Sequence, residues 1–178
     1  MDRFRILPGL PGAGSWPEQF SKTGRGTHRE GLVVEFFPDT PQAWVGNFQP
    51  GLAGYNAVLP HLDGTSLIVI AGGEAYVINP EERRLLTVFG GDIDLALVIP
   101  SLGLFVISSA GIHFEARDRT GLAWRTRRIS WDGMQDIRIE NDKLNGEAWS
   151  PIDNCYYPFS VDLRTGAVEG GSYNGPPG

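Results

Sequence analysis

Short apolar runs separated by turns recur along most of the chain. The runs "LIVI" (67–70) and "LFVI" (104–107) are apolar at every position, which predicts strands buried on both faces. The runs "RLLTVF" (84–89) and "LAWRTRRI" (122–129) mix apolar and polar residues, which predicts strands nearer a sheet edge. Glycine (24 residues) and proline (13) are abundant, and they favour many short strands and turns over long helices.

This pattern repeats with a period of about forty residues. Pro60, Pro100 and Glu140 stand at equivalent places, forty residues apart. A period in this range is typical of propellers and other repeat arrays. Each repeat predicts four short antiparallel strands joined by tight turns. The three segments that align are Ala57–Gly91, Leu97–Gly133 and Ile137–Tyr173.

An earlier segment, Gly31–Phe48, matches only the last hairpin of a repeat, so the count is about three and a half units. Residues 1–30 are predicted to be irregular, with one weak strand in "RFRIL", and residues 174–178 to be a loose tail. We therefore expect a single all-β repeat domain over residues 31–173.

The hairpins "VINPEERRLLTVFGG", "FEARDRTGLAWRT" and "FSVDLRTGAVEGG" resemble blades of β-propellers of the WD-repeat and quinoprotein-like kind. Each has an Asp- or Asn-centred turn between two alternating strands. The Gly-His dipeptide of true WD repeats is missing, and Trp-Asp occurs once. The chain is also similar to uncharacterised bacterial proteins with "WRTRRISWDG" and "PFSVDLRTG" segments, a resemblance that implies no activity.

The resemblance implies a small or incomplete β-propeller. Propellers typically have four to eight blades, so the N-terminus could complete a fourth blade, or the units could form an open arc. The alternative is a two-sheet β-sandwich or barrel. An open arc leaves a sheet edge that proteins usually cover, and a homodimer is one way to cover it.

The composition is that of an ordinary globular protein, with 41% hydrophobic and 20% charged residues. The net charge of -6 argues against nucleic-acid binding and suits a basic partner protein. No apolar run is long enough for a membrane span, and the N-terminus does not match a signal peptide. A single cysteine, Cys155, is expected to be a buried thiol. We therefore expect a cytoplasmic protein.

Candidate catalytic groups do not combine into a recognisable motif. His28, His61 and His113 lack zinc-ligand spacing. The glycine-rich "PGLPGAGSW" lacks the strand and helix of a phosphate-binding loop. We therefore expect neither a metal nor a cofactor. The alternative is a carboxylate-based hydrolase acting on glycans, which needs two acids, such as Asp92 and Asp132, converging in one pocket.

Late aromatic residues beside carboxylates are the strongest candidates for a binding surface, because such pairs make good contacts with a basic partner. Trp131 and Asp132 also lie in a link between units, where they are expected to shape a turn. The sequence favours a non-catalytic protein-binding module of a bacterial cytoplasm, immunity- or antitoxin-like or scaffolding. A lectin-like carbohydrate binder is another alternative. The candidate partner-binding residues are Trp131, Asp132, Asp136, Trp149, Asp153, Tyr156 and Tyr157.

Overall fold

The computed structural model describes residues 3–39 and 42–176. In this part of the chain, all regular structure is β-strand except the short 3-10 turn η1 (Pro100–Leu102). No helix there is long and apolar enough to cross a membrane. The chain divides into two compact units, Met1–Ile93 and Asp94–Gly178.

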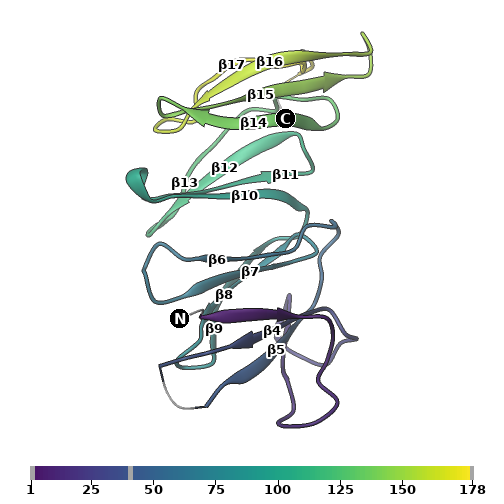
Figure 1. Cartoon of the computed structure of the whole chain (residues 1–178). Helices are drawn as coiled ribbons and strands as arrows, with labels where there is room; N and C mark the ends of the chain where they lie inside the picture. Colours follow the sequence, from purple (N-terminus) through teal and green to yellow (C-terminus); the bar gives the residue numbers. More distant parts are fainter. Residues whose placement is uncertain (1–2, 40–41, 177–178) are drawn as a thin grey trace. The chain divides into compact units, whose positions relative to one another are not determined.

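Each unit contains two sheets (Figure 1). Sheet A contains β1 (Phe4–Leu7), β2 (Glu18–Ser21), β3 (Gly24–Arg25), β4 (Leu32–Phe36) and β5 (Trp44–Phe48). Sheet B contains β6 (Ala57–Pro60), β7 (Leu67–Ala71), β8 (Glu74–Asn79) and β9 (Arg84–Gly90). Sheet C contains β10 (Ile93–Ile99), β11 (Leu104–Ser109), β12 (His113–Asp118) and β13 (Gly121–Arg125). Sheet D contains β14 (Met134–Glu140), β15 (Lys143–Ser150), β16 (Cys155–Asp162) and β17 (Val168–Gly170).

The repeat predicted from the sequence is confirmed in sheets B, C and D. Each has four strands in sequential order, and β7 and β11 are buried at every position. The edge strands β9 and β13 are the mixed runs. None of these sheets closes on itself, and there are four sheets rather than two. The fold is therefore neither a barrel nor a two-sheet sandwich.

The expectation of coil through the first thirty residues was wrong for Glu18–Arg25, which forms β2 and β3. Sheet A has the order β1-β4-β5-β2-β3, and β2 pairs with β5 in parallel. Phe20 on β2 is fully buried, so its apolar surface explains why this short segment joins the sheet. The N-terminal segment thereby completes a fourth sheet around the β4–β5 hairpin. Of the predicted loose tail, residues 177–178 lie outside the described residues.

Repeated Asx turns fix the hairpins in register. The Oδ1 atom of Asp118 accepts hydrogen bonds from the Thr120 amide and hydroxyl. Asp162 does the same with Thr165. These hydrogen bonds, above all those from the threonine hydroxyls, lower the pKa of both aspartates because they favour the charged form. The Asp-centred turns predicted from the sequence are confirmed here.

Each unit has its own hydrophobic core between its two sheets. In the first unit, aromatic rings from sheet A contact sheet B, and Phe48 lies 5.4 Å from Tyr76 between ring centroids. In the second unit, Phe114 of sheet C lies 5.9 Å from Phe159 of sheet D. Within the second unit, sheet D packs against sheet C through one face only. Its other face carries the aromatic pair Trp149 and Tyr156.

Candidate functional site

The β15–β16 hairpin carries an aromatic pair on the face of sheet D that points away from its core. Trp149 and Tyr156 are directly opposite each other in the register, and their ring centroids are 4.8 Å apart. Leu144 and Ala148 of β15 are fully buried. Because side chains alternate along a strand, Trp149 points to the opposite face. Tyr156 is 43% exposed.

The turn of this hairpin is ordered by its own side chains. The Ser150 hydroxyl donates a hydrogen bond to Asp153 Oδ2 at 3.0 Å, and the Tyr157 hydroxyl donates to the same oxygen at 3.0 Å. Hydrogen bonds to Cys155 and then to Asp153 raise the pKa of Tyr157 to about 12. The turn therefore holds Ile152, which is 67% exposed, on an ordered loop.

Cys155 is exposed, so the expectation of a buried thiol was wrong. The first four residues of β16 are all exposed, and burial begins only at Phe159. The alternation expected of a buried strand is therefore absent from this half of β16. Its exposed start places Tyr156 and Tyr157 in contact with solvent.

The Trp131–Asp132 link lies at the same end of sheet D as this hairpin. The Ser172 hydroxyl donates to the Trp149 carbonyl at 2.6 Å and accepts from the Trp131 amide at 3.3 Å. The buried Ser130 hydroxyl donates to the Gly133 carbonyl at 2.6 Å and lies 3.2 Å from the same Trp149 carbonyl, and it accepts from the Asp132 amide. These two serines fix the link against the end of β15.

The Trp131 side chain is partly buried and packs against its neighbours. Its centroid lies 4.5 Å from that of Tyr173, and the Arg128 guanidinium lies 5.6 Å from the Trp131 ring and 4.7 Å from the Tyr173 ring. The indole nitrogen is buried and has no hydrogen-bond partner. These contacts are those of a structural residue. Asp132 beside it is exposed.

Six of the seven candidate residues therefore come from two segments at one end of sheet D, and four of them share the β15–β16 hairpin. Asp136 is the exception. It is exposed and has a φ of 53° at an irregularity of β14. Sequence reasoning missed Ile152, although an isoleucine inside the turn "SPIDN" is a visible signal. It also missed Ser130 and Ser172, because short polar residues are common in every link.

The arginines of "WRTRRISW" are engaged within the second unit. Arg125 Nε donates to Glu115 Oε1 at 2.7 Å, Arg127 donates to the Gly170 carbonyl at 2.7 Å, and Arg128 donates to the Trp131 carbonyl at 2.7 Å. The bond from Arg127 ties the link after β13 to β17 of sheet D. The three arginines of this segment therefore have a structural role.

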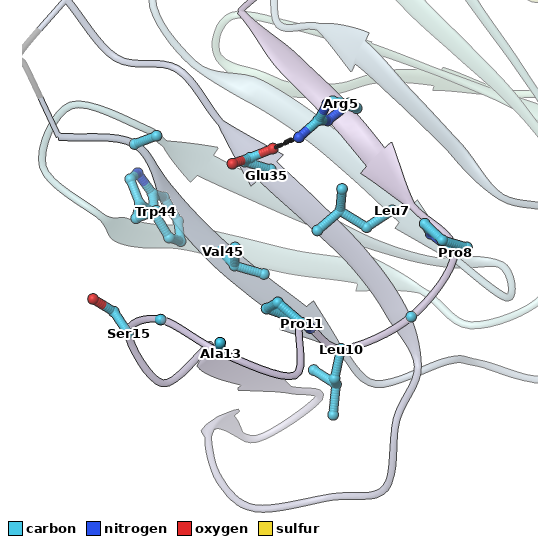
Figure 2. A pocket seen from close by; sticks show the side chains of 13 residues that line it. Arg5, Leu7, Pro8, Leu10, Pro11, Ala13, Ser15, Glu35, Trp44 and Val45 are labelled. Carbon is cyan, nitrogen blue, oxygen red and sulfur yellow. Dashed lines mark hydrogen bonds and ion pairs between the residues drawn. The ribbon is translucent and has the colours of Figure 1, made fainter.

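A separate pocket of about 640 Å³ lies on sheet A (Figure 2). Its floor contains the ion pair between Arg5 and Glu35, in which Arg5 Nη2 lies 2.5 Å from Glu35 Oε2. The glycine- and proline-rich segment from Pro8 to Ser15 forms the wall facing Val45. The glycine-rich segment "PGLPGAGSW" thus lines a hollow that contains both apolar side chains and an ion pair.

Three smaller pockets occur, one at β2 (about 370 Å³), one near Glu74 (about 190 Å³) and one near Asp94 (about 270 Å³). Each of these four pockets is lined by a single carboxylate. None of the four therefore holds the two acids that glycoside hydrolysis requires. Over residues 3–39 and 42–176, no three His, Cys, Asp or Glu side chains are grouped to hold a metal ion.

Comparison with known proteins places the fold. No protein-family model matches the sequence, and no curated protein does. A chain in the crystal structure of the mitotic checkpoint complex is similar over 93% of this chain, with a TM-score of 0.51 and 15% sequence identity. A crystal structure of a eukaryotic initiation factor is similar over 82% of this chain, with a TM-score of 0.46 and 10% identity.

This chain spans about half of the first neighbour's length (52%) and 40% of the second's. Together with the sequential four-stranded sheets, the likeness to the first neighbour shows an all-β fold of the β-propeller type. The resemblance inferred from the hairpins is thus confirmed at the level of the fold.

Proposed function

We propose that the chain is a non-catalytic protein-binding module and that it binds through the β15–β16 hairpin. We call Trp149, Ile152, Asp153, Tyr156 and Tyr157 the hairpin surface. The observation that carries the proposal is the exposure of Ile152, Tyr156 and Tyr157 on a turn held by internal hydrogen bonds. Aromatic residues held in place before binding lose little conformational entropy, and they dominate the energetics of many interfaces.

The charge near the hairpin surface favours a basic partner. Asp153 belongs to the surface, and Asp132 is exposed in the link tied to the end of β15. Asp136 adds a third exposed carboxylate on β14. Complementary charge speeds association and selects partners more than it adds affinity. A role in a bacterial cytoplasm as an immunity-like or scaffolding protein is consistent with such a surface.

The test is capture of proteins from the source cells on three immobilised forms of the chain. These are the wild type, the double variant Ile152→Asp/Tyr156→Ala, and the control Leu122→Ala. Leu122 is 56% exposed on β13 in the same unit, so its removal matches the loss of apolar surface elsewhere. The captured protein is then purified, and its Kd is measured by calorimetry at low and high salt.

We expect one protein to bind the wild type and Leu122→Ala, and to bind the double variant at least about tenfold more weakly. High salt should weaken binding if the partner is basic. A partner that binds all three forms equally would contradict the proposal that binding occurs through the hairpin surface. A wild-type chain that captures nothing but binds a glycan array through Trp149 and Tyr156 would replace the proposal with a lectin-like function.

A further inference from the structure

A buried carboxylate in the first unit lies in the small pocket near β8. Glu74 is the first residue of β8 and is 3% exposed, and it lines a hollow of about 190 Å³. A buried charge is costly unless it is closely paired and hydrogen-bonded. A glutamate at this position therefore needs a cation.

The cation that the chain itself supplies is held loosely. Lys22 Nζ lies 3.6 Å from Glu74 Oε2, beyond the usual hydrogen-bond distance of about 2.7–3.2 Å. The Lys22 side chain is 69% exposed, so solvent screens much of this pair. The carboxylate is thus only partly compensated.

The neighbouring groups leave the carboxylate accessible from the pocket. The Tyr76 hydroxyl donates to the Gln49 carbonyl at 2.7 Å, so it is occupied elsewhere. Burial, and then the charge of Glu74, raise the pKa of Tyr76 and keep it protonated. At Gly91, whose φ is +129°, a Cβ atom would lie 3.4 Å from Glu74 Oε2. Gly91 therefore borders the approach to that oxygen, where a Cβ atom would make ordinary van der Waals contact with it.

We propose that this pocket binds a lysine side chain of a partner protein, whose ammonium pairs with Glu74 in place of Lys22. A compact ammonium suits a single carboxylate oxygen such as Glu74 Oε2, whereas a guanidinium prefers both oxygens in one plane. Leu52, 93% exposed, also lines the pocket and offers apolar surface to the alkyl stem of the lysine. The pocket lies in the first unit, so this proposal does not depend on the hairpin surface in the second.

The test is a titration of the ¹⁵N-labelled chain with Nα-acetyl-lysine methylamide, followed by NMR at the Gly51 and Gly91 amides. Nα-acetyl-norleucine methylamide is the uncharged probe, and Nα-acetyl-arginine methylamide is the guanidinium probe. The variants are Glu74→Gln, which keeps the shape and removes the charge, and Lys22→Ala, which removes the competing cation. Lys143→Ala is the control, since Lys143 is also loosely paired, 3.9 Å from Glu169 in the other unit.

We expect the lysine probe to shift both amides in the wild type and to bind Lys22→Ala several-fold more tightly. Lys143→Ala should behave as the wild type, and Glu74→Gln should lose at least about tenfold in affinity. If Glu74→Gln does not fold, the Lys22→Ala result decides. Equal binding of the norleucine or arginine probe, no shift in the wild type and in Lys22→Ala, or weaker binding by Lys22→Ala would each overturn the proposal.

Discussion

The two serines beneath the Trp131–Asp132 link should stabilise the second unit cooperatively. Ser172 and Ser130 both contact the Trp149 carbonyl, at 2.6 and 3.2 Å. Replacing either serine with alanine leaves that carbonyl one hydroxyl partner. Each serine also has other partners, because Ser130 donates to the Gly133 carbonyl at 2.6 Å and Ser172 accepts from the Trp131 amide at 3.3 Å. Each single substitution should therefore cost about 1–3 kcal/mol in the free energy of unfolding.

The double variant removes both partners and leaves the carbonyl unsatisfied. Because an unsatisfied buried acceptor costs about 1–3 kcal/mol, the double variant should lose about 1 kcal/mol more than the two single losses together. In a unit of this size, each kcal/mol corresponds to roughly 4–8 °C in Tm. Ser160→Ala is the control, because the Ser160 hydroxyl is buried without a partner and its removal should cost little.

The assay is urea denaturation of the four variants and the wild type, monitored by circular dichroism and tryptophan fluorescence. Equal m-values would show that the same surface is exposed in each case. If the two single-variant losses in free energy of unfolding sum to the double-variant loss within about 0.5 kcal/mol, the argument that both serines share one carbonyl is refuted. A large loss for Ser160→Ala would show that size rather than hydrogen bonding determines the effect.

Three further outcomes follow from the structure. Gly146→Ala should destabilise sheet D by about 1–3 kcal/mol, measured by urea denaturation, because the new Cβ would lie 2.7 Å from Ile137 Cδ1. Ultraviolet titration should show Tyr157 ionising near pH 12, with Asp153→Asn moving its pKa toward 10; an unchanged pKa would contradict the hydrogen bond. Burial opposes ionisation of Asp63, but hydrogen bonds from Ser66 lower its pKa below 3.8. The stability that Asp63 adds over Asp63→Asn is therefore present above pH 3.8 and should shrink as the pH falls from about 5 to about 2; a constant difference would contradict this account.

The strands and their repeat could be predicted from the sequence because they depend on local patterns. The run "LIVI" lies in β7, which is buried at every position. The Asp-centred turns at Asp118 and Asp162 form the expected hydrogen bonds within three residues. Apolar alternation and turn chemistry depend on a few neighbouring residues, so they can be recognised in the sequence.

The candidate surface was predicted in its residue types and only partly in its arrangement. Trp149 and Tyr156 pair across β15 and β16, whereas Trp131 packs against Tyr173. Both contacts were invisible in the sequence, since cross-strand register and the position of the C-terminal residues decide them. Glu74 was a missed signal, because a charge directly before an apolar run indicates a buried ionic site.

The sequence by itself determined an all-β chain of four-stranded units, their turns and the approximate order of core and edge strands. Tertiary structure alone decided that Glu18–Ser21 pairs in parallel with β5. It also decided that Lys22 approaches Glu74 and that the start of β16 stays exposed. The physical reason is range: strands and turns are set by neighbours in the chain, whereas these contacts join residues brought together only when sheets pair and pack.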